Sequence, residues 1–304
     1  MSVPPTADAP AVGARSGTIS VRRAGSRADD LLRWISVLSL DAPLVALAWL
    51  WALGRPTSWE AGALALAVWW GYAVDRWLDG WKREVVEHGA ARHRFAARHR
   101  WVWGAFLAAV FAAAFAAIPA RLESRLVSAG VVLAALLALY TALDQLWPRT
   151  LRAWAQRESW VALAVAAAVV LFAGWGNAGA ADLASAMGVG LALFALCAAD
   201  CRAIRLLEGA RTIDRGLRGM RGPLVLCGVS AAAFALSGGL PQALAAFGFG
   251  VYMALCFERR RPAPQGERES HDTVAPSCDL ALAAFGLGAA LFGLAFDSTA
   301  LLAS

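Results

Sequence analysis

Two carboxylates four residues apart stand at the end of a long apolar segment, which reads WWGYAVDRWLDG over residues 69–80. Residues at positions i and i+4 lie on one face of a helix, so Asp75 and Asp79 are expected to point the same way. A charged group beside hydrocarbon is costly and is usually kept for function. This pair is therefore the first candidate for chemistry.

A second acidic pair, Asp200 and Glu208, ends another apolar segment and is spaced by two i+4 steps, so both acids share roughly one helix face. Paired carboxylates on facing helices suit Mg²⁺, which is typically held by one or two carboxylates together with substrate phosphates. The ion would serve as a Lewis acid on a diphosphate leaving group. The predicted metal ligands are Asp75, Asp79, Asp200 and Glu208, with Asp75 and Asp79 also predicted as the catalytic pair.

Basic side chains accompany both acidic pairs, and arginine can bind phosphate oxygens in a bidentate manner. The predicted diphosphate-binding residues are Arg76, Lys82, Arg83, Arg94, Arg202 and Arg205. The loop 80–100 is expected to form a short helix that caps this face of the protein. A structural alternative is that these bases form ion pairs at helix ends, worth about 0–1 kcal/mol each if exposed, or contact lipid headgroups.

Apolar helices must position these residues. The 304 residues are 59% hydrophobic and have a mean hydropathy of +0.55, too apolar for a soluble domain of this length. Long runs of Ala, Leu and Val without alternation argue against a membrane barrel. We predict an all-α polytopic membrane protein with one domain, residues 31–304, and nine transmembrane helices of roughly 20 residues each. The predicted spans are 31–53, 59–78, 101–118, 126–146, 159–175, 183–207, 223–237, 240–257 and 279–301.

The distribution of Lys and Arg predicts the orientation. Of these 28 residues, 25 fall on one side of the predicted membrane, and only Arg55, Arg121 and Arg125 fall on the other. The positive-inside rule then places the N-terminus in the cytoplasm and the C-terminus outside. Residues 1–30 lack an apolar run and are expected to be a disordered cytoplasmic tail. We expect an integral protein of a bacterial inner membrane with no nucleic-acid partner, because no basic surface interleaved with aromatic residues is present.

The nine-helix plan, the Asp-Arg-x-x-Asp ending of the second span and the acidic end of the sixth resemble the UbiA-type prenyltransferases. The resemblance covers roughly residues 31–301. It implies a ring of helices that binds Mg²⁺ and an isoprenyl diphosphate. It also implies transfer of the isoprenyl group to a lipophilic acceptor, of aromatic or quinone type, within the membrane. A tyrosine of the fourth helix often lies near the diphosphate in that family, and Tyr140 is at the matching end.

The chain departs from the family's motifs at several positions. The first motif opens with Asn-Asp in the family but with Gly71-Tyr72 here, and Ile204 replaces the middle acid of the second motif. A basic residue often follows the helix-four tyrosine at i+4, where this chain has Asp144. Because the two motifs contain fewer acids here than in the family, the site is expected to bind metal more weakly or to hold fewer ions. Tyr72, Tyr140 and Asp144 are the predicted substrate residues on these two helices.

Asp41 is the fourth predicted substrate residue and lies inside the first predicted span, two residues before Pro43. Pro43 predicts a kink, because it removes an intrahelical hydrogen bond. A carboxylate within the membrane indicates function, such as contact with the polar head of the acceptor. The alternative is a buried, protonated acid bonded to a freed carbonyl.

Two other kinds of residue are assigned no chemistry. Asp279 opens the ninth span, where its negative charge suits the helix dipole. The cysteines make no CxxC pair and have no histidine partner at ligand spacing, so they are interpreted as small core residues. They are Cys197, Cys201, Cys227, Cys256 and Cys278.

The predicted function is thus Mg²⁺-dependent isoprenyl transfer within the membrane, with lipid as the surrounding partner. Two alternatives stay open. The incomplete motifs are also compatible with a non-catalytic relative that binds a lipid or a partner. Carboxylates in a membrane can also relay protons, which would make the protein a small transporter.

Overall fold

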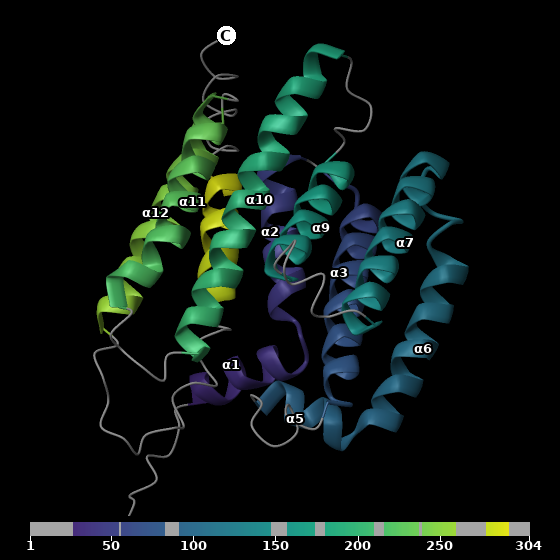
Figure 1. Cartoon of the computed structure of the whole chain (residues 1–304). Helices are drawn as coiled ribbons and strands as arrows, with labels where there is room; N and C mark the ends of the chain where they lie inside the picture. Colours follow the sequence, from purple (N-terminus) through teal and green to yellow (C-terminus); the bar gives the residue numbers. More distant parts are fainter. Residues whose placement is uncertain are drawn as a thin grey trace, which may run out of the picture.

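The computed structural model is a bundle of helices, drawn in Figure 1. It describes residues 27–54, 56–82, 91–146, 157–173, 180–209, 216–236, 239–259 and 278–291, and these ranges contain no β-strand. The elements are α1 (Arg27–Val37), α2 (Asp41–Leu53), α3 (Ser58–Asp79), α5 (Ala91–Arg98), α6 (Arg100–Ala117), α7 (Ser124–Leu146), α9 (Arg157–Phe172), α10 (Ala180–Gly209), α11 (Gly216–Leu236), α12 (Leu240–Arg259) and a last helix, Cys278–Leu291. The all-α prediction is confirmed for this part of the chain. Of the predicted tail, residues 1–26 lie outside it.

Within the described residues, three helices are long and apolar enough to cross a membrane, and the bent pair formed by α1 and α2 passes the same test if it is counted as one span. The three helices contain the stretches Arg100–Ala117 in α6, Ser124–Leu143 in α7 and Ser185–Ile204 in α10. Four other predicted spans coincide with apolar helices of 10–17 residues, which are shorter than the roughly 20 residues that a full crossing needs. Membrane association follows from the three long helices, whereas the full set of nine spans stays a prediction.

Apolar side chains cover the outside of α6 and α7, which form one edge of the bundle (Figure 1). Only 6% of the apolar stretch in α6 and none of that in α7 is buried, against 56% in α10. The exposed residues include Phe106, Phe111, Phe115, Val131 and Leu136. An apolar surface of this extent marks contact with another molecule or with a membrane, and acyl chains would cover it in a bilayer.

The first predicted span is two helices rather than one, because α1 and α2 meet at 87°. Ser39 has φ of 60°, its N–H donates to the Ser36 carbonyl at 3.1 Å, and the N–H of Leu40 donates to the Ile35 carbonyl at 2.9 Å. This pair of bonds is a Schellman motif, which ends a helix with one residue in the left-handed region. The chain therefore turns at Ser39, and α1 runs across the end of the bundle.

Pro43 does not kink a helix, so that prediction is wrong. It occupies the first turn of α2, which begins at Asp41. The N–H groups of a first turn have no intrahelical acceptor, so a proline there removes no hydrogen bond. Asp41 is likewise a first-turn residue, and its negative charge complements the positive end of the helix dipole.

The helix α3 begins at a complete capping box. The Glu60 N–H donates to the Thr57 hydroxyl at 3.3 Å, and the Thr57 N–H donates to the Glu60 carboxylate at 2.6 Å. At its other end, α3 contacts α5, the short helix predicted in the loop 80–100, which is confirmed. Both α1 and α5 lie across the same end of the bundle, next to the end of α3 (Figure 1).

Tryptophans of α3 connect it to its neighbours through their indole N–H groups. Trp69 donates to the Leu38 carbonyl at 2.9 Å, and Trp70 donates to the Leu107 carbonyl of α6 at 3.0 Å. The first of these bonds satisfies a carbonyl that the break after α1 leaves without an intrahelical donor. Such satisfaction matters in lipid, where water cannot supply the missing hydrogen bond.

The packed core lies between α2, α3, α9, α10, α11, α12 and the last helix. Its centre is Trp49 of α2, which is 1% exposed and stacks on Phe234 of α11 with ring centroids 5.5 Å apart. Most other core residues are alanines, and small residues let helices approach closely, as in membrane bundles. This core reaches Ala203 near the end of α10, and along α3 it extends as far as Val68, with Tyr72 packed against it.

Candidate functional site

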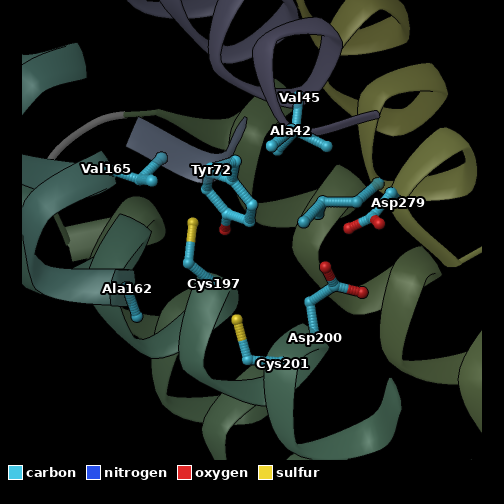
Figure 2. A pocket seen from close by; sticks show the side chains of 10 residues that line it. Ala42, Val45, Tyr72, Ala162, Val165, Cys197, Asp200, Cys201 and Asp279 are labelled. Carbon is cyan, nitrogen blue, oxygen red and sulfur yellow. The ribbon is translucent and has the colours of Figure 1, made fainter. Parts of the chain in front are cut away.

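Five helices surround a small cavity near the C-terminal part of α3 (Figure 2). Its free volume is about 20 Å³, which is room for roughly one water-sized occupant. The residues that line it are Ala42, Val45, Tyr72, Ala162, Val165, Cys197, Asp200, Cys201, Asp279 and Leu282. The two segments predicted to carry chemistry, in α3 and α10, therefore meet at one place through Tyr72 and Asp200.

The polar side chains of this cavity are acidic or neutral. Asp200 is 4% exposed, and its Oδ1 atom is buried without a hydrogen-bond partner. Its carboxyl group faces that of Asp279, as Figure 2 shows. Tyr72 and the thiols of Cys197 and Cys201 complete the polar lining, which includes no Lys or Arg among the residues that the structure describes. The cavity thus suits a positive or hydrogen-bond-donating occupant.

Arg76 points to the break between α1 and α2. Its guanidinium donates to the Ser36 carbonyl and to the Ser39 hydroxyl, the latter at 2.7 Å, and lies 3.6 Å from the Asp41 carboxylate. Both members of this ion pair are buried, with side-chain exposures of 10% and 1%. The pair fixes the turn after α1 to α3. Its predicted contact with diphosphate stays a prediction.

The structure gives Asp41 an ion-pair partner that neither sequence interpretation proposed. Its Oδ1 accepts the Ala42 N–H at 3.1 Å, and its Oδ2 faces Arg76. Its position is consistent with either a structural role or a role beside a bound substrate.

The first acidic pair lies outside the cavity lining. Asp79 is 6% exposed and accepts a hydrogen bond from Lys82 Nζ at 2.8 Å, while the Lys82 side chain is 38% exposed. Asp75 is half-buried on the same helix. The ion pair expected under the structural alternative thus forms at Asp79. Because Lys82 is partly exposed, this pair is worth no more than about 1 kcal/mol.

The other predicted residues are spread over several elements. Arg202 is half-buried in α10, and its Nε atom is buried without a hydrogen-bond partner. Tyr140 of α7 stacks on Trp160 of α9 at 5.0 Å, and Arg94 is exposed on α5. The side chains of Asp144, Arg205 and Glu208 lie outside the described residues, as does all of Arg83.

Sequence reasoning missed Asp279, Cys197 and Cys201 as cavity residues. Cys197 and Cys201 are four positions apart on α10, and this spacing places them on the face that also presents Asp200. Asp279 gave only the signal of an acid in the first turn of a helix. None of the five cysteines forms a disulfide.

No group of three or more His, Cys, Asp or Glu side chains is arranged to hold a metal within the ranges given above. That part of the chain does not include the side chain of Glu208, one of the four predicted ligands. Comparison with family models, with curated proteins and with solved structures gives no match to this chain. The likeness to the UbiA-type enzymes therefore rests on the motif residues alone.

Proposed function

We propose that this protein is a membrane-embedded, Mg²⁺-dependent transferase of UbiA-like type, with nine spans and a cytoplasmic N-terminus in a bacterial inner membrane. It moves an isoprenyl group from an isoprenyl diphosphate to a lipophilic acceptor. The observation that supports this proposal best is the meeting of α3 and α10 at one cavity, where Tyr72 and Asp200 occupy positions equivalent to motif acids. These helices are far apart in sequence, so their meeting is not a consequence of chain proximity.

One residue of the cavity, Asp200, offers an oxygen ligand for a magnesium ion. The buried Oδ1 of Asp200 has no hydrogen-bond partner, and Mg²⁺ prefers oxygen ligands. Asp200 would hold the ion from α10, with Asp75 and Asp79 on the α3 side and Glu208 eight residues, or about two helical turns, further along α10. When bound, Mg²⁺ supplies Lewis acidity to the departing diphosphate.

The basic residues divide into two groups in this proposal. Arg202 has a buried Nε without a hydrogen-bond partner, so its guanidinium group has an N–H available to phosphate oxygens. It does not line the cavity, because positions i and i+2 of a helix face different ways. Arg94 and Lys82 supply positive charge at the surface near α5. Arg76 instead keeps the α1–α2 turn in position over this end of the bundle.

Heterolysis of the allylic C–O bond yields a carbocation and free diphosphate, and the acceptor then forms the new bond and loses a proton. Tyr72 and Tyr140 carry aromatic faces that can stabilise positive charge. The isoprenyl tail and the acceptor enter from the lipid, which the exposed apolar faces of α6 and α7 contact in this proposal.

The non-catalytic alternative is favoured by one observation. Arg76 and Lys82, both predicted to bind diphosphate, are engaged with Asp41 and Asp79. In that interpretation the fold binds a lipid or a partner, and the acids form ion pairs at helix ends.

The transporter alternative is supported by the break between α1 and α2 next to the buried Asp41, because broken helices are common at the binding sites of transporters.

Assaying the reconstituted protein with allylic diphosphates of several chain lengths, Mg²⁺ and phenol or quinone acceptors tests the transferase. We expect Mg²⁺-dependent release of diphosphate and a prenylated acceptor. The double variant Asp75→Asn/Asp79→Asn should lose at least about 10²-fold in rate, because charge stabilisation at the leaving group is lost.

The matched control is Asp30→Asn, which removes an exposed acid of α1 and should leave the rate unchanged. Release of no diphosphate with any acceptor, together with no Mg²⁺-dependent binding of the diphosphate, would favour the non-catalytic reading. Substrate uptake into vesicles without chemical change would favour the transporter.

A further inference from the structure

The junction between α5 and α6 is strongly basic. Residues 91–103 contain four Arg and two His but no Asp or Glu. Arg98, the last residue of α5, and Arg100, the first residue of α6, are both exposed. The described acid that most closely precedes this segment, Asp79, is buried and accepts a hydrogen bond from Lys82. The positive charge of the junction therefore lies at the surface of the protein.

Packing fixes α5 across the end of the bundle (Figure 1). A side chain at Gly80 would come within 3.0 Å of the Ala97 backbone nitrogen, so α3 and α5 are in close contact. The Phe95 ring meets Trp34 of α1 and Trp103 of α6 edge-on, with centroids 6.4 Å and 5.9 Å apart. The inner face of α5 is therefore packed, and its position relative to α6 is set.

Indole rings surround Arg100. Its guanidinium carbon lies 4.6 Å from the centre of the Trp81 ring, which is a cation–π arrangement. Trp77 donates its indole N–H to the Arg100 carbonyl at 2.7 Å, and the rings of Trp81 and Trp101 meet edge-on at 5.2 Å. Trp101 is 71% exposed. Exposed tryptophans beside arginines are typical of the headgroup level of a bilayer, where one end of the ring is apolar and the other is hydrated.

An apolar surface begins directly after these residues. Val102 and Phe106 of α6 are exposed, and α6 is one of the helices that can cross a membrane. This helix leads from the basic junction along the outer edge of the bundle (Figure 1). A phospholipid has the same order of chemistry, with a phosphate at the membrane surface and acyl chains beside the hydrocarbon-facing helix. A soluble phosphate compound would match the arginines but not the apolar surface.

We propose that the α5–α6 junction is a binding site for an anionic phospholipid. Arg98 and Arg100 contact the phosphate headgroup, and the outer face of α6 contacts the acyl chains. Basic residues next to a membrane-crossing helix attract anionic lipids by charge. The site uses none of the cavity residues, so it does not depend on the transferase chemistry.

Native mass spectrometry of the full-length protein in detergent measures this binding directly. We expect the wild-type protein to retain phosphatidylglycerol in preference to phosphatidylcholine with the same acyl chains, since only the former carries a net negative charge. Arg98→Gln/Arg100→Gln should weaken the binding of phosphatidylglycerol at least about tenfold, because each arginine near an anionic surface contributes a several-fold increase in affinity. Arg98→Lys/Arg100→Lys keeps both charges and should retain most of the binding.

The opposite end of α6 offers a matched control. Arg121 lies over the Trp59 ring at 5.1 Å, but the exposed Glu123 follows it two residues later. Arg121→Gln therefore removes the same kind of cation–π contact from a surface where an acid offsets the charge. This variant should bind phosphatidylglycerol as the wild type does.

Thermal denaturation gives a second readout, because a ligand that binds only the folded state stabilises it. Phosphatidylglycerol should raise the melting temperature of the wild type and of Arg121→Gln, but not that of Arg98→Gln/Arg100→Gln. If the double variant is recovered unfolded, Arg98→Gln leaves the contact between Arg100 and Trp81 intact and should still weaken the binding several-fold. Equal retention of the two lipids by the wild type, or equal loss in the Arg121 variant, would overturn the proposal.

Inorganic diphosphate distinguishes a lipid headgroup from a soluble phosphate ligand. It carries negative charge but has no acyl chain, so an equal concentration should not displace bound phosphatidylglycerol. Displacement of the lipid by diphosphate would instead assign the two arginines to a soluble phosphate compound and would reject the lipid site.

Discussion

Replacing Arg76 with methionine is expected to lower the free energy of unfolding by about 3–5 kcal/mol. The substitution leaves the Asp41 carboxylate, whose side chain is 1% exposed, without its counter-ion. It also removes the donors to the Ser36 carbonyl and the Ser39 hydroxyl at the break after α1. Thermal denaturation in detergent should show a midpoint at least about 6 °C lower.

Two control variants separate the charge effect from the loss of packing. In Arg76→Met/Asp41→Asn both charges are gone, so most of the lost stability should return, because removing both partners of a buried pair costs far less than removing one. Lys82→Met breaks the partly exposed pair with Asp79 and should cost less than about 1 kcal/mol. Equal destabilisation by Arg76→Met and Lys82→Met would contradict the buried ion pair.

The second large effect concerns catalysis. Asp200→Asn should reduce the rate of diphosphate release at least about 10²-fold, because it removes an anionic ligand that Mg²⁺ requires near the leaving group. The amide has nearly the shape of the carboxylate and can donate a hydrogen bond to Asp279, so the fold should persist. The rate is measured by release of labelled diphosphate, and folding by circular dichroism.

Asp30→Asn again serves as the control, since it removes one acid from an exposed position. A rate for Asp200→Asn within about threefold of the wild type would exclude this residue from the site. Loss of both activity and secondary structure would instead assign Asp200 to the core.

Local patterns predicted the helices well but not the contacts between them. The run of apolar residues before Asp75 predicts α3, and the capping box at Thr57 fixes its start. The partner of Arg76 is set by the rotation of α3 relative to α2, which no short-range pattern encodes. For the same reason Asp279, far from Asp200 in sequence, looked like an ordinary first-turn acid.

The break in the first predicted span was assigned to the wrong residue for a related reason. Pro43 is a strong local signal and predicts a kink, whereas Ser39 in a left-handed conformation gives almost no signal in the sequence. Donors from another helix, Trp69 and Arg76, bond to the carbonyls exposed at this break. A feature that depends on such distant donors becomes visible only once the helices are packed.

The central claim is that the magnesium-bound diphosphate group binds where α3 and α10 meet, beside the small cavity, and a native thiol can report on it. Cys201 lines the cavity and is half-buried, while Cys256 of α12 is half-buried outside the cavity lining. The measurement is the rate of alkylation of each thiol, by mass spectrometry, with a non-reactive allylic diphosphate analogue and Mg²⁺. The account predicts that the analogue and Mg²⁺ together slow the alkylation of Cys201, that either one added without the other does not, and that the rate at Cys256 stays unchanged. In Asp200→Asn, the analogue and Mg²⁺ should not protect Cys201. Equal alkylation of Cys201 with and without Mg²⁺ and the analogue would contradict it.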